Sequence, residues 1–469
     1  MSQPDIRNLA NCIEDCRLAG LDQEAGPLDP TDFHVLRGRL QAIRERFSPL
    51  YQEVAFDPFV AKLDELGENK FTQILINDPT REGTGGLMLD IAQALLQRGE
   101  KFEAKALGAF EEVVADLYDG FLSAEDRRGV NPPDREVDPP LVKFGNPSFG
   151  PYTWPSDATQ SFGLRVAVIN LPPSNAHRGL LAWPALGHEG GGHDILHADI
   201  GLLSEVGEAV RTELSHDQGA AALAGYWADR IDEAASDVCG ILNMGPAAGI
   251  GLIGFFRGLD AAFGGPGKLR TVGPENDVHP ADILRGFLAA AVVRLLEFAG
   301  AANWAEVIEG ETEKDMATIR LAGKKVDPKV AKKSAEIVAK VIATHPMKSL
   351  ESHSFAEIQN WRDEDESIVQ LLRESLTTAN PVPGDLPRKI YAAHMVAAAA
   401  IEALSQGADI PVLFQRMLDL LKVKHDSNPV FGPLLVRRAG NITRDRAYIP
   451  NRLSGEGTPA ARPIRHRAG

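Results

Sequence analysis

The sequence predicts a mainly α-helical protein with one small β element just ahead of its most unusual motif. Apolar residues recur at the three- and four-residue spacing of amphipathic helices over much of residues 1–125 and again after residue 183. The best strand pattern is residues 164–171, which a glycine and a Pro-Pro pair delimit. One strong strand between two long helical regions favours a mainly α fold.

The N-terminal region is predicted to contain several helices. Pro30-Thr31-Asp32 is typical of a helix start, and apolar residues follow at helical spacing from Phe33 to Ile43. Residues 87–122 form a longer periodic region, which predicts two helices separated near Gly99.

The rest of the chain divides at a loop. Residues 126–160 are rich in Pro, Gly and Asp, which predicts an irregular segment before the strand. The helical pattern resumes near residue 183 and continues to about 265. It returns over 278–425, with an alanine-rich run at 392–404.

Composition and charge exclude some classes of protein. Apolar residues make up 44% of the 469-residue chain, enough for a sizeable core, so a fully disordered chain is excluded. The 49 basic and 65 acidic residues give a net charge of −16. An acidic surface repels phosphate backbones, which argues against nucleic acid as the main partner.

The charge is unevenly distributed along the chain. Residues 436–469 hold eight arginines and two acidic residues, a net charge of +6, which leaves −22 for the remainder. This basic tail is interpreted either as a solvated strap on an acidic body or as a separate interaction arm.

The sequence predicts a cytoplasmic protein without a membrane span. The first residues contain neither a basic region nor an apolar stretch typical of a signal peptide. Residues 238–256 are uncharged over 19 positions, long enough to cross a bilayer, but they contain five glycines together with Asn243 and Pro246. We therefore expect a buried, glycine-rich core segment there.

The chemistry concentrates in one segment, His188-Glu189-Gly190-Gly191-Gly192-His193-Asp194-Ile195-Leu196-His197. A hydrolytic zinc site needs three N or O ligands, an open position and a carboxylate beside the bound water. Five residues of regular helix turn through about 500°, which would leave the first two imidazoles about 140° apart. They converge only if the turn widens, and the three glycines would permit such a bulge.

A carboxylate further along the chain is predicted to complete the site. Asp229, Asp232, Glu233, Ser236 and Asp237 share one helical face, and the residues around them are apolar. A buried acidic stripe requires a counter-charge, which a dication would supply. We predict Glu233 as the third ligand and Asp237 as the partner of the free N–H of a ligating histidine.

These residues resemble a known family of peptidases. Residues 188–193 are similar to the H-E-x-x-G-H zinc motif of the dipeptidyl peptidase III family, including the glycine before the second histidine. The second motif of that family is E-E-C-R-A-E, whose second Glu binds zinc, and residues 232–237 carry acids at the same three positions. Metallopeptidases with a downstream Glu ligand share an E-x-x-x-D pattern, which Glu233 and Asp237 match.

The resemblance covers residues 183–245 and implies a metallopeptidase-like helical architecture. It implies Zn²⁺ as the cofactor, with His188, His193 and Glu233 as ligands and Glu189 as the general base. The expected division of the chain is an N-terminal helical region (1–125), a loop and strand segment (126–180), a metal-binding helical core (181–270), a C-terminal helical region (271–430) and a basic tail (431–469).

Other interpretations of the motif stay open. His193-Asp194-x-x-His197 is a second metal register that needs no bulge, with Asp194 in the place of the base. A site could instead use His188 together with these two histidines. Without a metal, the segment would be a glycine turn with solvated histidines or an anion-binding helix start.

Two further roles are assigned only as groups of candidates. A donor aimed at the reacting oxygen is needed, and six side chains can supply one. They are Tyr226, His216, His345, His353, Tyr391 and His394. The strand at 164–171 is either an edge strand that holds a substrate backbone or an interior strand of a small sheet.

The sequence thus predicts a zinc-dependent hydrolase that cleaves peptide bonds with a water activated by Glu189. The substrate would be a peptide or a small amide. One alternative is a zinc hydrolase that acts on a non-peptide amide or another small molecule. A second alternative is a helical scaffold with a vestigial metal site.

Overall fold

The computed structural model describes residues 3–22, 26–122, 130–131, 133–135, 138–146, 150–378 and 390–428. The fold is mainly α, as predicted, and its few strands are short. The predicted basic tail at 431–469 lies outside the described residues.

The predicted N-terminal helices are confirmed. The helix predicted to start at Pro30-Thr31-Asp32 is α2 (Phe33–Ile43), and the Asp32 carboxylate caps it by accepting a hydrogen bond of 2.8 Å from the backbone N–H of Val35. The region 87–122 contains α5 (Thr84–Glu100) and α6 (Ala104–Leu122), which separate at the positive-φ residues after Gly99. The other helices here are α1 (Leu9–Leu21), η1 (Arg44–Arg46), α3 (Pro49–Tyr51), η2 (Gln52–Phe56) and α4 (Asp57–Asn77).

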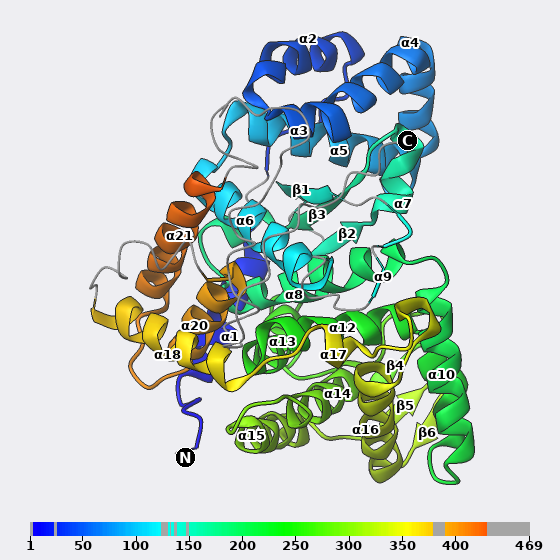
Figure 1. The fold of residues 1–469 in the computed structure, drawn as a ribbon, viewed down its shortest axis with the longest axis vertical. Coiled ribbons are helices and arrows are strands. Elements are labelled where there is room, and N and C mark those ends of the chain that lie inside the picture. Colours follow the sequence, from blue (N-terminus) through cyan, green and yellow to red (C-terminus); the bar gives the residue numbers. More distant parts are fainter. Residues whose placement is uncertain are drawn as a thin grey trace.

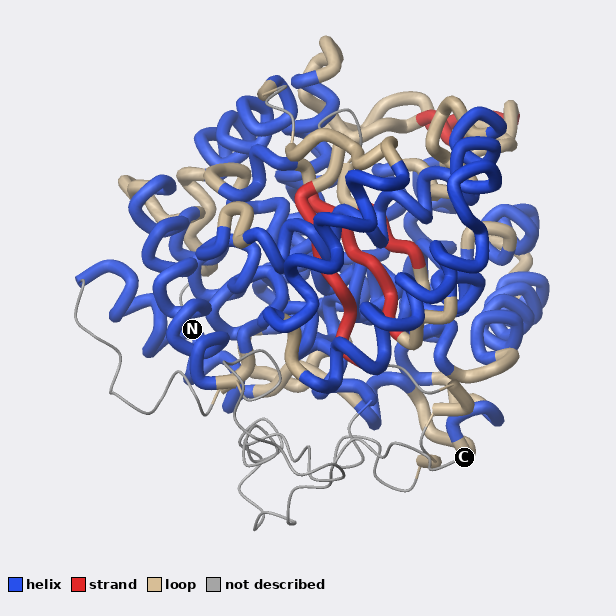
Figure 2. The backbone as a smooth tube through the Cα atoms, turned by 90° about the horizontal axis from the view of Figure 1, so that it is seen from above, coloured by secondary structure: helices blue, strands red, loops and turns tan. Residues whose placement is uncertain are grey.

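A three-stranded sheet lies near the middle of the molecule with helices around it (Figure 2). The predicted strand is β3 (Val166–Leu171), and it is central. It pairs in parallel with β1 (Asp138–Phe144) and antiparallel with β2 (Tyr152–Trp154). The interior alternative for β3 is therefore confirmed, and β2 is the edge strand on the side of the glycine-rich segment.

Strands β1 and β2 both fall inside the segment predicted as loop, so that prediction is wrong for these two strands. The sequence of β1, DPPLVKF, contains two adjacent prolines, which are typical of irregular segments because proline donates no backbone hydrogen bond. The register shifts between Asp138 and Leu141, so both prolines fall in an irregularity of an edge strand. The short helices α7 (Ser156–Thr159) and η3 (Gln160–Phe162) also fall in or beside this segment.

The sheet separates two hydrophobic cores. Val166 and Val168 on one face of β3 belong to a core that α2 to α5 build above the sheet in Figure 1. Ile169 and Leu171 on the other face belong to a larger core that continues through the remaining helices. The glycine-rich segment lies on the side of the larger core.

The uncharged segment 238–256 is buried, as predicted. It spans the end of α12 (Ile231–Met244) and most of α13 (Pro246–Ala262), with a sharp break at Gly245, whose φ is +60°. No helix among the described residues is long and apolar enough to cross a membrane.

The C-terminal helices begin at the bottom of Figure 1 and end at its left side, at the height of the central sheet. They are α14 (Asp282–Arg294), α15 (Ala301–Lys314), α16 (Pro328–Thr344), η8 (Lys348–Leu350), α17 (Phe355–Ile358), α18 (Asp363–Thr378), α20 (Ala392–Ala403) and α21 (Ile410–Ser427). A second small sheet, not predicted, has the strands β4 (Val272–Gly273), β5 (Ile319–Leu321) and β6 (Lys324–Val326).

Candidate metal centre

The motif lies on one winding helical path that follows β3. The path runs through η4 (Pro173–Ala176), η5 (Leu180–Ala185), α8 (Leu186–His188), η6 (Glu189–Asp194) and α9 (Ile195–Ala198). Segment η6 is a π-helix, the widened turn that the five-residue spacing of the histidines requires. The predicted bulge is therefore confirmed.

The glycines in this path allow a close crossing with α12. A Cβ on Gly187 would lie 3.0 Å from the Cα of Gly240, and a Cβ on Gly192 would lie 2.5 Å from the Cα of Ser236. None of the three motif glycines has a positive φ, so they are required for close approach more than for backbone freedom. This close packing places the two histidines directly above the acidic face of α12.

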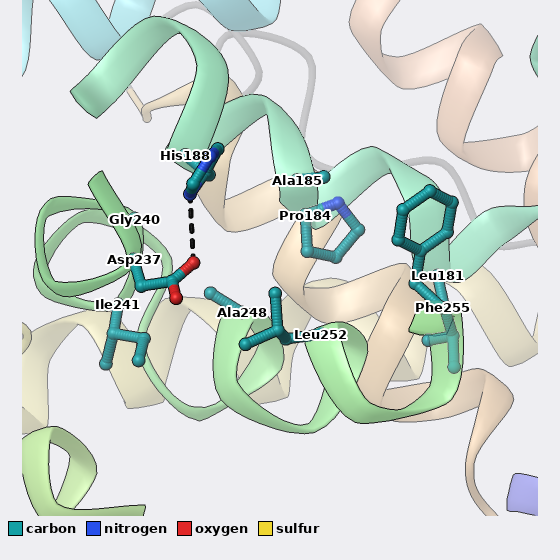
Figure 3. A pocket seen from close by; sticks show the side chains of 10 residues that line it. All are labelled: Leu181, Pro184, Ala185, His188, Asp237, Gly240, Ile241, Ala248, Leu252 and Phe255. Carbon is teal, nitrogen blue, oxygen red and sulfur yellow. Dashed lines mark hydrogen bonds and ion pairs between the residues drawn. The ribbon is translucent and has the colours of Figure 1, made fainter. Parts of the chain in front are cut away.

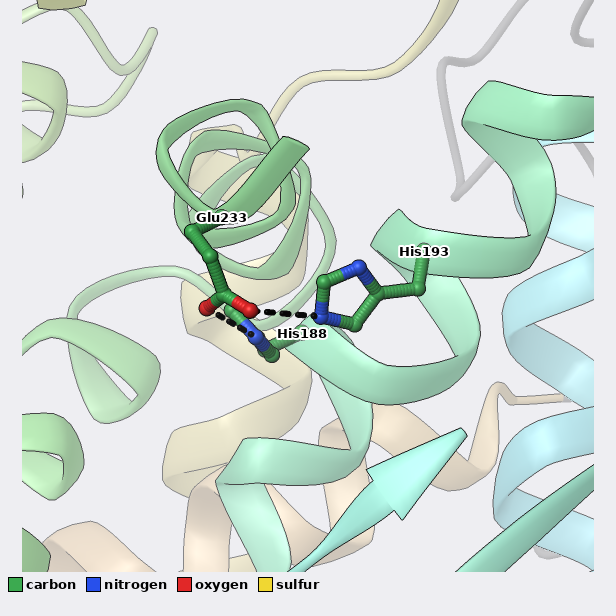
Figure 4. A group of neighbouring side chains, drawn as sticks. All are labelled: His188, His193 and Glu233. Atoms are coloured by element: carbon green, nitrogen blue, oxygen red, sulfur yellow. Dashed lines mark ion pairs between the residues drawn. The ribbon is translucent and has the colours of Figure 1, made fainter. Parts of the chain in front are cut away.

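The three predicted ligands converge. The ligand atoms of His188, His193 and Glu233 all lie within 4.8 Å of one another. The Glu233 carboxylate faces both imidazoles, with Oε2 3.3 Å from Nε2 of His188 and Oε1 3.4 Å from Nε2 of His193 (Figure 4). The two rings are perpendicular, with centroids 4.6 Å apart. The end of α8, the π-helix η6 and α12 therefore each present one donor atom to a common point.

Two carboxylates on α12 hold the outer nitrogens of the imidazoles. Nδ1 of His188 donates to Asp237 over 2.9 Å (Figure 3), as predicted for Asp237. Nδ1 of His193 donates to Asp232 over 3.0 Å, a contact that was not predicted. Because an ionised carboxylate only accepts hydrogen bonds, these contacts place the protons on Nδ1. The Nε2 lone pairs of the neutral rings are then directed at Glu233.

The residues fit a bound cation. Although Glu233 Oε2 is 3.3 Å from an imidazole nitrogen, it makes no hydrogen bond, and it is buried. An orphaned buried carboxylate oxygen is costly unless a proton or a metal ion satisfies it. Two imidazole nitrogens and one carboxylate are also the donor set of catalytic zinc sites.

The ionisation of the cluster follows from these contacts. Burial disfavours the charged forms, but the hydrogen bonds with nearby carboxylates outweigh it and raise the pKa of both His188 and His193. Burial likewise opposes ionisation of Glu233, but the two imidazoles hold the pKa of its carboxyl well below the usual range. Without a metal, these contacts therefore favour protonated imidazoles and an ionised Glu233.

One buried arginine supports the centre from α14. The Arg285 guanidinium donates to both oxygens of Asp237, each over 2.7 Å, and only 6% of the side chain is exposed. The third guanidinium nitrogen, Nη1, lies 3.7 Å from Glu233. Burial opposes ionisation of Asp237, but Arg285 keeps the pKa of this carboxyl below its ordinary value. The single guanidinium offsets only part of the negative charge around the ligands.

The predicted base, Glu189, lies beside the ligands and is held by β2. The Thr153 hydroxyl donates to Glu189 Oε2 over 2.8 Å. No described residue forms a hydrogen bond with Oε1. One oxygen of the carboxylate is thus fixed and the other is available.

The second metal register does not assemble. Asp194 accepts the backbone N–H of Ser156 over 2.6 Å, and burial raises the pKa of its carboxyl to about 7. His197 lies between two carboxylates, 3.3 Å from Asp157 and 3.2 Å from Asp232, outside the group of converging ligand atoms. Asp194 therefore stabilises the start of α7. His197 contacts Asp232, the carboxylate that holds the outer nitrogen of His193.

A cavity of about 740 Å³ opens over the centre. His188, Glu189, His193 and Glu233 form its floor, and β2 forms one side. The six side chains proposed as donors toward the reacting oxygen do not line it. Tyr226 accepts the Ala281 N–H within the protein, and the fully buried His394 pairs with Asp365.

His279 is a cavity residue that the sequence analysis missed. Its Nε2 lies 3.2 Å from Glu233 Oε1, and Nδ1 lies 3.0 Å from Asp277. The side chain is 47% exposed, so it stands at the mouth of the cavity. Thr153 and Arg285 were also missed. Only Arg285 carried a usable pattern, because an arginine within an apolar helix indicates a buried acidic partner.

Comparison with models of protein families, with curated proteins and with solved structures finds no match to this chain.

Proposed function

We propose that this protein is a zinc-dependent hydrolase that cleaves peptide bonds. The observation that carries the proposal is the convergence of His188, His193 and Glu233 within 4.8 Å, under a cavity that also exposes Glu189. The resemblance of residues 188–193 and 232–237 to the motifs of a zinc peptidase family supports the choice of metal and substrate class.

The roles of the residues follow from their contacts. His188, His193 and Glu233 would hold the metal, and Asp237 and Asp232 would fix the orientation of the two imidazoles. A bound zinc ion supplies a Lewis acid, which polarises a carbonyl and lowers the pKa of water to about 7.

Glu189 would move the proton. Thr153 fixes Oε2, so Oε1 can accept the proton of the attacking water and deliver it to the leaving nitrogen. His279 is the donor best placed at the cavity mouth to approach the developing oxyanion, since its ring lies 3.2 Å from Glu233.

The test is turnover of a panel of di- to octapeptides by zinc-loaded protein. Glu189→Gln should lower kcat/KM by roughly 10²- to 10⁴-fold at unchanged zinc content, because it removes the proton acceptor but no ligand. Glu208→Gln, a change at an exposed glutamate on α10 (Leu202–His216), is the matched control and should keep full activity.

Two results would contradict the proposal. Peptide cleavage that survives Glu189→Gln would remove the assigned base. Zinc-loaded wild-type protein that cleaves no peptide of the panel, but hydrolyses small non-peptide amides, would overturn the assignment of peptides as substrates.

A further inference from the structure

One wall of the cavity is apolar and continuous. Five apolar side chains line the cavity on one side, four from α13 and one from the residue that follows it. They are Leu252, Phe255, Phe256, Leu259 and Phe263. Their spacing of 0, 3, 4, 7 and 11 residues keeps them within an arc of about 100° on one helical face. We name this surface the α13 wall.

The opposite face of α13 is fully used in packing. Gly254 and Gly258 lie against α1, where an added Cβ on Gly258 would lie 3.1 Å from the backbone of Arg17. By contrast, Leu252, Phe256 and Leu259 are only partly buried, and Phe263 is 68% exposed. The α13 wall is thus an apolar surface that the described residues leave facing the cavity.

The wall begins at the metal centre. Leu252 and Phe255 line a small recess that also contacts His188, and Figure 3 shows Leu252 projecting from α13 toward Pro184. At a rise of about 1.5 Å per residue, the wall extends about 16 Å from Leu252 to Phe263. That length equals about five residues of extended chain.

Polar and apolar groups are therefore segregated within one cavity. The carboxylates and imidazoles of the centre gather at its floor, whereas the five side chains of the α13 wall are apolar. Asp260 of α13 also lines the cavity, but its carboxylate accepts the backbone N–H groups of Gly267 and Lys268. A substrate that places its reacting carbonyl over the floor must lay one flank along the wall. Burying an apolar flank there stabilises the complex, and a charged flank would lose hydration without a partner.

We propose that the substrate carries an extended apolar group, aromatic or branched aliphatic, and that the α13 wall binds it beside the reacting bond. This inference rests on the proposed function, because the metal centre fixes where the reacting carbonyl lies. It names Leu259 and Phe263 as residues that determine substrate specificity.

The experiment uses two probes with the same metal-chelating group, acetohydroxamate and octanohydroxamate. Their affinities for zinc-loaded full-length protein are measured by titration calorimetry. Octanohydroxamate should bind at least about tenfold more tightly, since each buried methylene contributes up to about fourfold. The double variant Leu259→Asn/Phe263→Ser should reduce that ratio to below about threefold and leave acetohydroxamate binding unchanged.

Two further variants keep the test decisive. Phe263→Ser alone changes an exposed side chain, so it folds even if the double variant does not, and it should reduce the ratio in part. Ile76→Ser, at a 70% exposed position on α4, is the matched control and should preserve the ratio.

Three outcomes are distinguishable. A reduced ratio in the α13 variants supports the inference. Equal binding of both probes, or a ratio that survives the variants, overturns it and leaves the proposed function intact. Acetohydroxamate binding that does not depend on zinc overturns the metal centre, and the inference with it.

Discussion

Two buried charged clusters in this protein use their polar atoms differently. Arg257 on α13 donates to Asp315 over 2.7 Å and to Glu311 over 2.9 Å, and no buried side-chain atom of the three residues lacks a partner. In the candidate metal centre, Glu233 faces the Nε2 atoms of His188, His193 and, at the cavity mouth, His279. A neutral imidazole whose proton is on Nδ1 cannot donate to Glu233. We name Arg257, Asp315 and Glu311 the satisfied cluster. We name His188, His193 and Glu233 the converging cluster.

The difference teaches how to separate structural from functional charge. Both clusters are buried, and both perturb pKa values, so neither property distinguishes them. What distinguishes the converging cluster is that its lone pairs point at one another. Such an arrangement is repulsive unless a proton or a metal ion occupies the space between them.

The largest expected effect is on the satisfied cluster. Arg257→Met removes the buried guanidinium shared by two buried carboxylates and should lower the free energy of unfolding by about 3–5 kcal/mol. Zinc affinity should not change. Urea unfolding and a zinc titration measure the two effects. Arg294→Met removes an exposed ion pair with Glu309 and should cost less than about 1 kcal/mol. Equal losses in the two variants would break the comparison.

The next effect concerns the carboxylates that orient the imidazoles. Asp237→Asn and Asp232→Asn should each weaken zinc binding by about 10- to 100-fold, because the amide no longer holds the Nδ1 proton with a charge. Competition with a chromophoric chelator measures the affinity. Asp157→Asn changes a carboxylate that contacts His197 and Arg135 but none of the three ligands, so it should change the affinity by less than about threefold. If all three variants weaken binding equally, the effect is not specific to the ligands.

The pH dependence of zinc binding sharpens the same contrast. Burial opposes protonation, but nearby carboxylates raise the pKa of His188 and His193 above the ordinary histidine value of about 6.5, so the metal must displace protons. Affinity should rise with pH until the raised pKa values are passed, by about tenfold per pH unit for each proton displaced. Chelator competition between pH 6 and pH 9 measures this. An affinity that is flat over that range would contradict protonated imidazoles in the metal-free centre.

In the metal-free protein, the stability that the two histidines contribute changes with pH in the opposite direction to the zinc affinity. A histidine with a raised pKa contributes stability that is fully present below its unfolded-state pKa, which is about 6.5. That contribution is lost as the pH rises through the folded-state pKa. The stability supplied by the converging cluster without metal should therefore decline in the alkaline direction, and the gain on adding zinc should increase.

The smallest expected effect is at the base. Thr153→Val removes one hydrogen bond to Glu189 and should lower kcat by about 3- to 10-fold, the usual worth of such a bond, at unchanged zinc content. Thr153→Ser retains the hydroxyl and should restore most of the rate. Steady-state kinetics on a cleaved peptide measures both variants, and a loss in Thr153→Ser equal to that in Thr153→Val would indicate packing instead.

Local spacing predicted much of the site. The interval from His188 to His193 required a widened turn, and the acidic face at 229–237 supplied a carboxylate at the right place on α12. Both inferences depend only on helical geometry within a single segment. For the same reason, the long helices α2, α5 and α6 were predictable from periodicity alone.

Features that depend on contacts between distant segments were not predictable. Thr153 reaches Glu189 only because β2 pairs with β3, and His279 reaches Glu233 from a loop more than forty residues away. Strand β1 was missed because its prolines occupy an irregular edge position. The sequence suggested that Gly192 gives the backbone freedom to bulge, whereas the structure shows that it allows the close approach of α12. That approach cannot be inferred from the spacing of the motif.

Metal content tests the central claim most directly. Protein purified without chelator, or dialysed and reloaded with zinc, should contain one equivalent by mass spectrometry of the metal. Glu233→Ala and His188→Asn should retain almost none, whereas His197→Asn should retain a full equivalent. Wild-type protein without stoichiometric metal, or metal that persists in Glu233→Ala and is lost in His197→Asn, would contradict the account.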